Sequence, residues 1–424
     1  MNDTIFALSS GSPPAAIAVV RISGPRSEAA LEALAGKLPG PRVAQLANLR
    51  WRGEPLDRAL VLRFPGPHSA TGEDVAELHL HGGRAVVAAV LEALAGVEGL
   101  RPAEPGEFTR RAFENGRIDL AEAEGLADLL AAETQSQRRA ALAMAGGALS
   151  RQVEAWRQRL LAMAAAVEAV LDFSDEGEVG DTLPQGLSDD LTALRAEIAA
   201  ALARPTVERL RDGIRVVIAG PPNAGKSSLL NALVQREAAI VSSVAGTTRD
   251  VIEVPAAIRG TPFLLTDTAG LRDSGDEIES IGVARARDRL AEADIVLWLG
   301  EPDRGPARTI LVAAKADLRE DPDMAYADVA VSARTGAGID RLLALLEERA
   351  QALLPGESEA AFNSRQETAA AVALGQLDRA AQETDLLLLA ESLRLTRLEL
   401  DRITGQAGVE DMLDALFGRF CIGK

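Results

Sequence analysis

The segment that most constrains this chain is G-P-P-N-A-G-K-S at 220–227, which directly follows the apolar run I-R-V-V-I-A at 214–219. A glycine-rich turn between a buried strand and a helix-prone run is typical of a P-loop. Gly220 and Gly225 let the backbone turn tightly, so that successive N–H groups can surround phosphate oxygens above the positive end of the helix. Lys226 is expected to reach the β- and γ-phosphates, and the Ser227 hydroxyl to ligate Mg²⁺. The sequence therefore predicts a nucleotide site.

Two later segments extend this site toward the metal and the γ-phosphate. G-T-T-R-D at 246–250 fits a switch loop, in which Thr248 would supply a second hydroxyl to Mg²⁺. A short apolar strand at 263–266 runs into D-T-A-G at 267–270. This order places the carboxylate of Asp267 beside the metal and lets a glycine turn toward the γ-phosphate.

Two further segments fit the recognition of guanine. The strand predicted at 310–314 leads into K-A-D at 315–317, where Asp317 can accept hydrogen bonds from guanine N1 and N2, which adenine does not offer. S-A-R at 332–334 fits a loop that contacts the base. Each later segment is weak alone, but together behind a P-loop they indicate a GTPase. The predicted nucleotide contacts are Asn223, Ala224, Gly225, Lys226, Ser227, Ser228, Asp267, Thr268, Ala269, Gly270, Lys315, Asp317, Ser332, Ala333 and Arg334.

Length and composition limit the classes of protein to which the chain could belong. The 424 residues are 47% hydrophobic, which suggests two to four packed domains and excludes a disordered chain. A single cysteine, Cys421, excludes a disulfide framework and fits a reducing cytosol. No basic stretch opens the N-terminus, and the longest apolar runs fall far short of the roughly 20 residues of a membrane span. We expect a soluble cytoplasmic protein with no membrane partner.

The chain is strongly acidic, and its charge is unevenly distributed. The formal net charge is −18. Residues 1–117 carry 13 Lys and Arg against 13 Asp and Glu, so the whole excess of acid lies in 118–424. Because nucleic acid attracts positive surfaces, a direct RNA contact would need a local basic patch or a partner that supplies one.

Three compositional zones organise the chain. Residues 1–117 alternate β-type segments at 16–23, 59–64 and 75–81 with turns and one clear helix at 84–95. This zone predicts a small α+β domain whose strands are short and few.

The rest of the chain is helical on both sides of the P-loop domain, which spans 211–350. Residues 118–210 and 351–424 have helical periodicity, with an acidic loop at 175–186; the clearest helices are at 120–133, 152–171, 366–381 and 385–404. The favoured interpretation is one helical domain carrying an inserted nucleotide domain, because insertion requires neighbouring ends. Two separate helical regions are the alternative.

Two residues are candidates for roles in hydrolysis that other residues have in other GTPases. Asn223 could bind K⁺ beside the phosphates and do the electrostatic work of an arginine finger; an ordinary surface turn residue is the alternative. Leu271 stands where Ras-like GTPases have a water-orienting glutamine, and leucine cannot hydrogen-bond. Glu279 is therefore our candidate catalytic residue beside Lys226, and a solvated carboxylate at a helix start is the alternative.

Two other features have ordinary interpretations. His79 and His81 share one face of a predicted strand, but a metal site would need a third ligand, so half-exposed polar residues are favoured. The tail F-C-I-G-K at 420–424 is not a prenylation box, because Gly423 is not aliphatic and Lys424 is a poor final residue. We interpret it as an ordered end beside a site, with Cys421 as a candidate reactive thiol; an unreactive cysteine is the alternative.

Over nearly its whole length the chain resembles the MnmE (TrmE) family of tRNA uridine-modification GTPases. The resemblance rests on the asparagine-containing P-loop, G-T-T-R-D, D-T-A-G-L-R and the F-C-I-G-K tail. It also covers the N-terminal segments D-T-I at 3–5, R-I-S-G at 21–24, T-G-E-D at 71–74, H-G-G at 81–83, P-G-E-F at 105–108 and D-L-A-E-A at 119–123. It implies a multidomain α/β protein: an N-terminal α+β domain similar to tetrahydrofolate-binding enzymes, and an all-helical domain with an inserted Ras-like GTPase domain.

The resemblance also implies an activity. The chain would hydrolyse GTP with K⁺ and Mg²⁺. As a homodimer joined through residues 1–117, in a heterotetramer with a flavin-dependent MnmG (GidA) type protein, it would add an aminomethyl or carboxymethylaminomethyl group to C5 of wobble uridine in certain tRNAs. The complex would contact the tRNA, and the carbon would come from 5-formyl- or 5,10-methylene-tetrahydrofolate. The positions implied are Arg21, Glu77, Arg117 and Lys424 for folate, Asn223, Ser242, Val244 and Thr247 for K⁺, and Ser227 and Thr248 for Mg²⁺.

Three positions depart from the family pattern. Ala314 replaces the asparagine of N-K-x-D, an amide that contacts the base and ties its loop to the P-loop, so we expect weaker GTP binding or some loss of base selectivity, while Asp317 remains. Arg117 replaces a lysine, which keeps the charge and changes the geometry. Ala70 stands where an aromatic residue is common, which alters one wall of the folate pocket.

A function of another class stays open at this point. A GTP-dependent switch with dimerising G domains could control the assembly of a partner, for example on the ribosome, without modifying tRNA. The F-C-I-G-K tail and the folate-like N-terminal zone favour the modifying enzyme.

Overall fold

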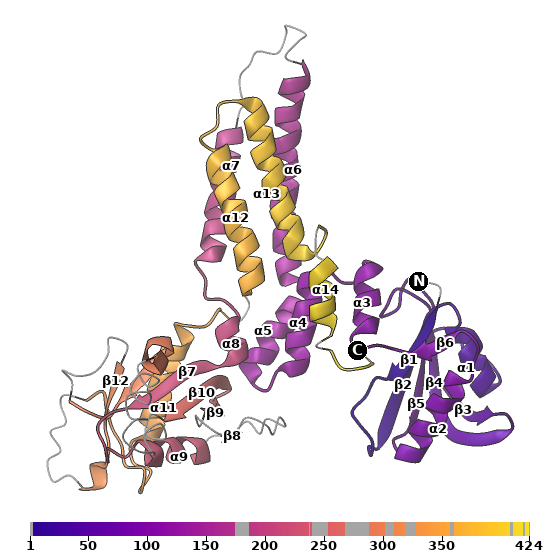
Figure 1. The fold of residues 1–424 in the computed structure, drawn as a ribbon, viewed down its shortest axis with the longest axis horizontal. Coiled ribbons are helices and arrows are strands. Elements are labelled where there is room, and N and C mark those ends of the chain that lie inside the picture. Colours follow the sequence, from indigo (N-terminus) through magenta and orange to yellow (C-terminus); the bar gives the residue numbers. More distant parts are fainter. Residues whose placement is uncertain are drawn as a thin grey trace, which may run out of the picture. The chain divides into compact units, whose positions relative to one another are not determined.

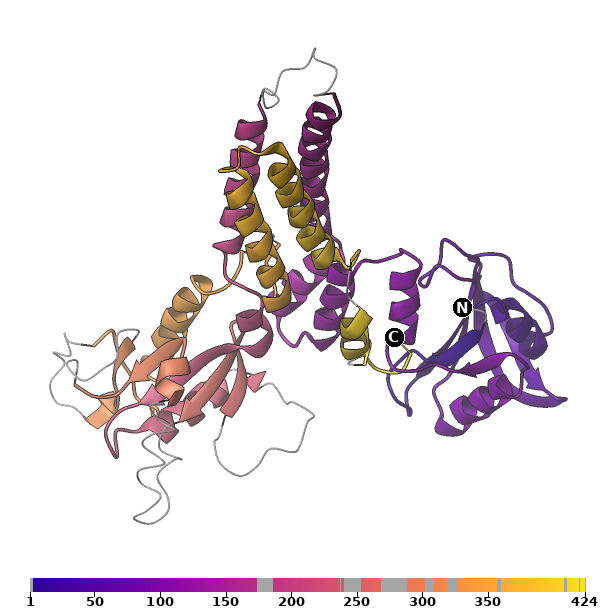
Figure 2. The same cartoon turned by 45° about the horizontal axis from the view of Figure 1, so that its top comes forward.

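The computed structural model describes residues 3–173, 186–236, 238–239, 253–267, 288–301, 309–318, 327–356, 360–407, 410–418 and 420–423. The chain divides into two compact units, Met1–Ala127 with Asp401–Lys424, and Asp128–Leu400. Figures 1 and 2 label and colour the elements of both units.

The first unit is built on a six-stranded sheet with the order β3-β4-β5-β2-β1-β6. The strands are β1 (Thr4–Leu8), β2 (Ile17–Ser23), β3 (Gln45–Trp51), β4 (Glu54–Phe64), β5 (Val75–His81) and β6 (Leu100–Pro102). Side chains alternate along a strand, so every second residue of β2, β4 and β5 faces one side. On that side α1 (Ser27–Ala35) and α2 (Arg84–Ala95) cover the sheet, and Leu31 and Val90 pack with Val20 and Leu78 in one apolar core.

One expectation for this zone is confirmed and another is wrong. The helix predicted at 84–95 is α2, and α1 and α3 (Glu107–Glu114), which were not predicted, form besides it. The expectation of short and few strands is wrong in its number and in part in its length, since the sheet has six strands and β4 has 11 residues, although β1 has five and β6 three. A sheet of this size can hold a core of its own. The pairing of a sheet edge with a second copy is therefore no longer a reason to expect that two copies associate.

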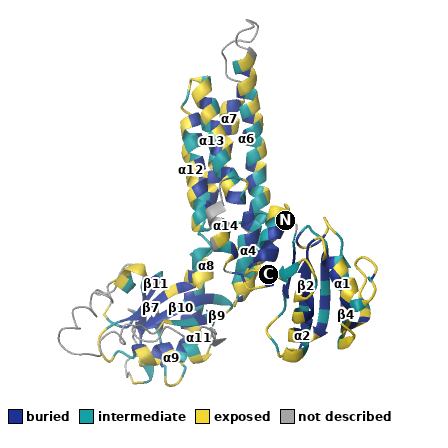
Figure 3. Ribbon diagram, turned by 45° about the vertical axis from the view of Figure 1, so that its right-hand side comes forward, coloured by how far each residue is buried: buried dark blue, intermediate teal, exposed yellow. Residues whose placement is uncertain are grey.

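The other face of this sheet is covered only in part (Figure 3). α3 packs over β1, where Ile5 and Phe108 share a small core. Farther along the face, the side chains of Ile17, Leu46 and Leu60 are exposed by 61%, 51% and 37%. Leu46 lies opposite Leu60 in the register of β3 and β4, so these two apolar side chains are neighbours.

The C-terminal segment completes the first unit. An apolar cluster joins α4 (Leu120–Ala131), α14 (Glu410–Phe417) and the residues that follow α14. Its buried members are Leu120, Ala123, Leu413, Phe417 and Phe420. The cluster therefore anchors the beginning of the tail.

The second unit contains long helices and a second sheet. Beyond α5 (Gln135–Ala145), the helices α6 (Ala148–Phe173), α7 (Leu187–Leu202), α12 (Ser364–Ala380) and α13 (Leu386–Thr404) lie side by side as a bundle (Figures 1 and 2). Leu194 and Ile198 of α7 and Leu377 of α12 are fully buried, as the apolar stripe of a bundle helix requires. Within the described ranges, no helix carries an apolar stretch long enough to cross a bilayer.

The second sheet has the strand order β13-β12-β11-β7-β10-β9-β8. Its strands are β7 (Ile214–Ala219), β8 (Ala238–Ala239), β9 (Glu253–Ile258), β10 (Thr261–Asp267), β11 (Ile295–Trp298), β12 (Thr309–Ala313) and β13 (Val329–Ala330). β7 pairs in parallel with β10 and β11, and α9 (Lys226–Arg236) and α11 (Ile339–Gln351) pack on the sheet. Such sheets bind ligands beyond the carboxyl ends of their strands.

The chain enters and leaves this sheet domain at neighbouring points. The N–H of Val207, just before α8 (Glu208–Asp212), donates to the carbonyl oxygen of Phe362, just before α12, at 3.0 Å. The hydroxyl of Ser364 donates to Glu208 at 2.7 Å. Neighbouring ends are what an inserted domain requires. The boundaries predicted at 117, 210 and 350 stay predictions.

Candidate functional site

The P-loop connects the end of β7 to the start of α9. Gly220, Asn223 and Gly225 have positive φ angles of 147°, 62° and 99°. A Cβ on Gly220 would lie 3.1 Å from the Cβ of Leu299. A larger residue at this position would therefore be both strained in its backbone and crowded by Leu299. Asn223 tolerates a left-handed conformation better than most residues, and its exposed side chain makes no hydrogen bond to a described residue. Its amide oxygen is therefore available to a cation.

The first residues of α9 meet the end of β10. The ammonium of Lys226, which is 7% exposed, donates to the carbonyl oxygens of Gly220 at 3.2 Å and Pro221 at 2.9 Å. The hydroxyl of Ser227 donates to the carboxylate of Asp267. A hydroxyl and a carboxylate oxygen side by side suit Mg²⁺, which prefers oxygen ligands. The structure thus brings together the two residues that the sequence assigns to the metal region.

A pocket of about 160 Å³ opens beside the P-loop. Its lining residues are Gly225, Ser228, Leu229, Ala314, Lys315, Asp317, Leu318, Val331, Ala333 and Arg334. The ammonium of Lys315 reaches across to the carbonyl oxygen of Asn223 at 2.6 Å. This bond ties the base loop to the P-loop, a connection that the side chain of Ala314 cannot make.

Asp317 is held by two donors in this pocket. The Ser332 hydroxyl donates to one carboxylate oxygen at 2.6 Å, and Nε of Arg334 donates to the other at 2.8 Å. The bond from Ser332, with a smaller contribution from Arg334, lowers the pKa of the Asp317 carboxyl below its usual value. Asp317 is therefore ionised at neutral pH and can accept hydrogen bonds from a guanine edge.

Part of the predicted site lies outside the described residues. These positions are Ser242, Val244, Thr247, Thr248, Thr268, Ala269, Gly270, Leu271, Glu279 and Lys424. Their assigned roles stay predictions.

A second polar site lies on the sheet of the first unit. β2 and β5 place Arg21 opposite Glu77, and the two side chains form an ion pair with an N–O distance of 2.9 Å. Nε2 of His79 lies 3.2 Å from the other carboxylate oxygen of Glu77. The guanidinium of Arg21 also lies 5.8 Å from the ring centre of Phe108. The site thus presents a carboxylate, a cation and an aromatic ring together.

Arg117 lies next to the T-G-E-D loop at 71–74. A Cβ on Gly72 would lie 3.2 Å from Cγ of Arg117 and 2.7 Å from Cβ of Asn115, so only glycine allows this approach. Asn115 also donates to the carbonyl oxygen of Thr71 at 2.8 Å. Among the described residues no hydrogen bond or ion pair joins Arg117 to the Arg21–Glu77 pair, so their shared role in binding stays a prediction.

Behind this loop lies a buried ion network that the sequence analysis missed. Arg111 is 1% exposed and pairs with Asp3, Glu73 and Glu107 at 2.9–3.0 Å. Glu73 also accepts from the Ser23 hydroxyl at 2.8 Å. The signal available in the sequence was the acidic residue within each of T-G-E-D and P-G-E-F, but nothing in either motif names its partner.

The tail reaches the same sheet. Ile422 forms a β-bridge with Pro105, and a Cβ on Gly423 would lie 2.0 Å from the carbonyl oxygen of Leu8. The hydroxyl of Ser9, beside Gly423, is buried without a hydrogen-bond partner among the described residues. Ser9 follows β1, in which Ala7 lies opposite Arg21, so an unmet polar atom at this end of the sheet fits a polar ligand. Cys421 is exposed in this segment.

The two strand histidines each contact a carboxylate. His81 lies 2.7 Å from Asp57, and His79 contacts Glu77. Within the part of the chain that the structure describes, no group of three or more His, Cys, Asp and Glu could hold a metal.

Comparison with protein-family models gives two matches. The model of the GTP-binding protein TrmE N-terminus matches residues 4–117, and that of the MnmE helical domain matches residues 120–421. The chain belongs to the MnmE family. A relative from Rhizorhabdus wittichii, named tRNA modification GTPase MnmE, is 60% identical over 100% of this chain and 97% of its own. One of the same name from Erythrobacter litoralis is 58% identical over 100% of both chains.

Two of the solved structures that this MnmE-family chain resembles match part of it. The G domain of the T. maritima FeoB iron transporter is 25% identical over 32% of this chain and 99% of its own, with a TM-score of 0.25. Era in complex with MgGDPNP and 16S ribosomal RNA nucleotides is 24% identical over 38% of this chain and 66% of its own, with a TM-score of 0.25. At these TM-scores the two structures add nothing to the argument about function.

Proposed function

We propose that this chain is a GTP hydrolase that takes part in modifying C5 of the wobble uridine in certain tRNAs. The observation that carries the proposal is that one chain holds two different sites. One is the P-loop site with Ser227, Asp267 and the Asp317 pocket; the other is the Arg21–Glu77 site beside the tail. Relatives that match the whole chain are named tRNA modification GTPases.

The nucleotide site would work with two cations. Mg²⁺ would bind the Ser227 hydroxyl beside Asp267, and K⁺ would bind the exposed amide of Asn223. When bound, the cations offset charge on the phosphates during hydrolysis. Lys226 lies at the base of the loop, where it can leave its carbonyl partners and meet the phosphates. Glu279 would orient the attacking water, because Leu271 cannot.

The second site would hold a tetrahydrofolate that supplies the carbon. The carboxylate of Glu77 would accept hydrogen bonds from the edge of the pterin ring. The cations Arg21, Arg117 and Lys424 would bind the carboxylates of the glutamate tail. The buried, unpartnered Ser9 hydroxyl supports a polar ligand here. A flavin-dependent partner of the MnmG type would bring the redox chemistry, and the complex would supply the tRNA contact that a chain of net charge −18 makes poorly by itself.

We also propose that two copies associate through the sheet of the first unit. Ile17, Leu46 and Leu60 are exposed apolar side chains on the same face as Arg21 and Glu77. Residues 1–117 carry no net charge, so two copies repel little there. Sedimentation of the full chain tests this: Leu60→Asp should give monomers, whereas Leu387→Asp, which changes a still more exposed leucine of the other unit, should not. A dimer unaffected by Leu60→Asp would contradict this surface.

The experiment that tests the main function is nucleoside analysis of tRNA from a deletion strain. The strain should lack the C5-modified wobble uridine, and the wild-type gene should restore it. Ser227→Ala and Arg21→Ala should each fail to restore it, since they remove different sites. Full modification in the deletion strain would favour the alternative, a GTP switch that controls the assembly of a partner.

A further inference from the structure

Strands β9 and β10 form a hairpin that connects two parts of the nucleotide site in the sequence. β9 begins at Glu253, three residues after the G-T-T-R-D motif, and β10 ends at Asp267, the first residue of D-T-A-G. The tip is a two-residue turn, Arg259–Gly260, whose φ angles are 49° and 83°. Positive φ at both central residues is typical of the tight turn that matches the twist of a hairpin. Movement at either end of such a hairpin reaches its tip along paired strands.

The tip of this hairpin is held by the first turn of α5. The hydroxyl and the backbone N–H of Ser136 donate to the carbonyl oxygen of Gly260 at 2.9 Å and 3.2 Å. A Cβ built on Gly260 would lie 3.6 Å from the Cβ of Gln135. Arg259 in turn forms an ion pair with Glu347 of α11 at 2.8 Å. The hairpin is thus bound on one side to a helix outside the nucleotide domain.

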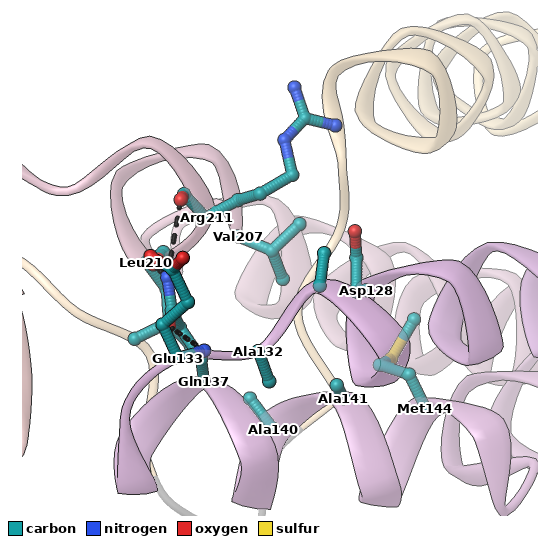
Figure 4. Close-up of a pocket in the computed structure, with 11 residues that line it drawn as sticks. Asp128, Ala132, Glu133, Gln137, Ala140, Ala141, Met144, Val207, Leu210 and Arg211 are labelled. Carbon is teal, nitrogen blue, oxygen red and sulfur yellow. Dashed lines mark hydrogen bonds between the residues drawn. The ribbon is translucent and has the colours of Figure 1, made fainter. Parts of the chain in front are cut away.

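The same turn of α5 also holds the element that leads into the P-loop strand. The amide NH₂ of Gln137 donates to the carbonyl oxygens of Leu210 and Arg211, at the end of α8, at 3.1 Å and 3.3 Å. Its amide oxygen accepts from the N–H groups of Glu133 and Thr134, both at 2.9 Å, which closes the capping box of α5. One side chain therefore caps α5 and binds α8, as Figure 4 shows.

The packing around this contact leaves room for movement. A cavity of about 100 Å³ lies between α4, α5 and α8, next to Gln137. Small side chains form much of its wall, including Ala132, Ala140 and Ala141 (Figure 4). Tightly packed interiors resist displacement, and this open pocket leaves α8 without close packing on that side.

We propose that Ser136 and Gln137 are positioning residues that couple the state of the nucleotide site to the helical part of the second unit. They join the tip of the β9–β10 hairpin and the start of the P-loop strand to one rigid helix turn. The inference rests on the proposed GTPase function. Because coupling between sites is reciprocal, a change in this contact must alter the relative affinities for GDP and a GTP analogue if the contact differs between the two nucleotide states.

The test measures the ratio of affinities for GDP and a non-hydrolysable GTP analogue on the full chain. A disulfide between Gln135→Cys and Gly260→Cys, in a Cys421→Ser background, would lock the contact. The Cβ separation of 3.6 Å falls within the range of a disulfide. We expect the ratio to change by about fivefold or more between the oxidised and reduced forms of the same protein.

A second arm breaks the contact without a cross-link. Gln137→Glu keeps the oxygen that caps α5 but replaces the donor to α8 by a second acceptor. Gln135→Glu is the matched control, because it adds the same charge to the same helix turn, at an exposed position that does not contact Leu210 or Arg211. We expect Gln137→Glu to shift the affinity ratio and Gln135→Glu to leave it unchanged; Gln137→Glu should also melt lower, because its carboxylate faces two carbonyl oxygens, so the ratios are compared at a temperature where both proteins are folded.

The possible results distinguish a failure of the proposed coupling from a failure of the proposed GTPase function. Equal ratios for the oxidised and reduced protein, or a Gln137→Glu ratio equal to that of the wild type or of Gln135→Glu, would overturn the coupling and leave the GTPase intact. If the disulfide does not form, the Gln137→Glu arm decides alone. A wild-type chain that binds neither nucleotide would instead overturn the proposed function.

Discussion

Replacing Arg111 by methionine should strongly destabilise the first unit. The guanidinium is 1% exposed and pairs with Glu107, which is 6% exposed, and with Glu73 and Asp3. Removing one partner of a buried ion pair leaves an uncompensated charge, which costs about 3–5 kcal/mol. Methionine fills most of the volume of the arginine side chain. The loss of stability therefore measures the removal of the charge rather than the opening of a large cavity.

Native-state hydrogen exchange of the full chain measures this loss locally, on peptides from β2 and β5. Because about 1.4 kcal/mol is a factor of ten, protection of these amides should fall by roughly two to three and a half orders of magnitude. Arg110→Met is the matched control on the same helix, since Arg110 is 38% exposed and pairs with exposed Glu114 and Asp414. Such surface pairs contribute about 0–1 kcal/mol. Equal losses of protection in the two variants would refute the reasoning.

The network also predicts a pH dependence. Burial by itself raises the pKa of the Glu107 carboxyl, but hydrogen bonds from Arg101, the backbone N–H of Glu104 and Arg111 outweigh it and lower the pKa below the usual 4.5. The folded-state pKa is then below the unfolded one, so this stabilisation is complete above about pH 4.5 and is lost as the pH falls through the folded value. The difference in protection between wild type and Arg111→Met should therefore narrow in acid. A gap that stays constant down to pH 3 would contradict this origin.

Four further substitutions test the two sites. Asn223→Ala should abolish the faster GTP turnover in K⁺ than in Na⁺, and equal wild-type rates in both salts would contradict the cation site. Glu279→Ala should bind GTP yet lose most hydrolysis in single-turnover assays; near-normal kcat would refute its role. Ala314→Asn should tighten GTP in competition binding; an unchanged affinity would contradict this and show that the Lys315 bond to Asn223 already replaces the missing amide. Gly423→Ala should displace the tail and weaken folate binding in calorimetry while leaving GTP hydrolysis unchanged.

The sequence by itself determined the features that depend on local order. The P-loop is readable because its glycines, Lys226 and Ser227 are consecutive and lie between an apolar strand and a helix. The apolar period of 84–95 predicts α2 with both ends correct, and the predicted helix at 385–404 differs from α13 by one residue. In each case the determining interactions lie within a few residues of each other, so a pattern along the chain records them.

The sequence pattern did not predict several short or weakly patterned helices and strands. α1 and α3 were missed, and β1 and β3 were not predicted as strands. Their form depends on the sheet they pack against, since elements of 5 to 9 residues have little stability alone.

Only the tertiary structure decided which distant side chains meet. Arg111 with Glu73, Lys315 with the carbonyl of Asn223, and Ser136 with that of Gly260 are separated by 38, 92 and 124 positions. No periodicity encodes such pairs, because their geometry follows from how strands and helices stack rather than from spacing. The same holds for Gly423, whose need for glycine comes from the carbonyl of Leu8 at the opposite end of the chain.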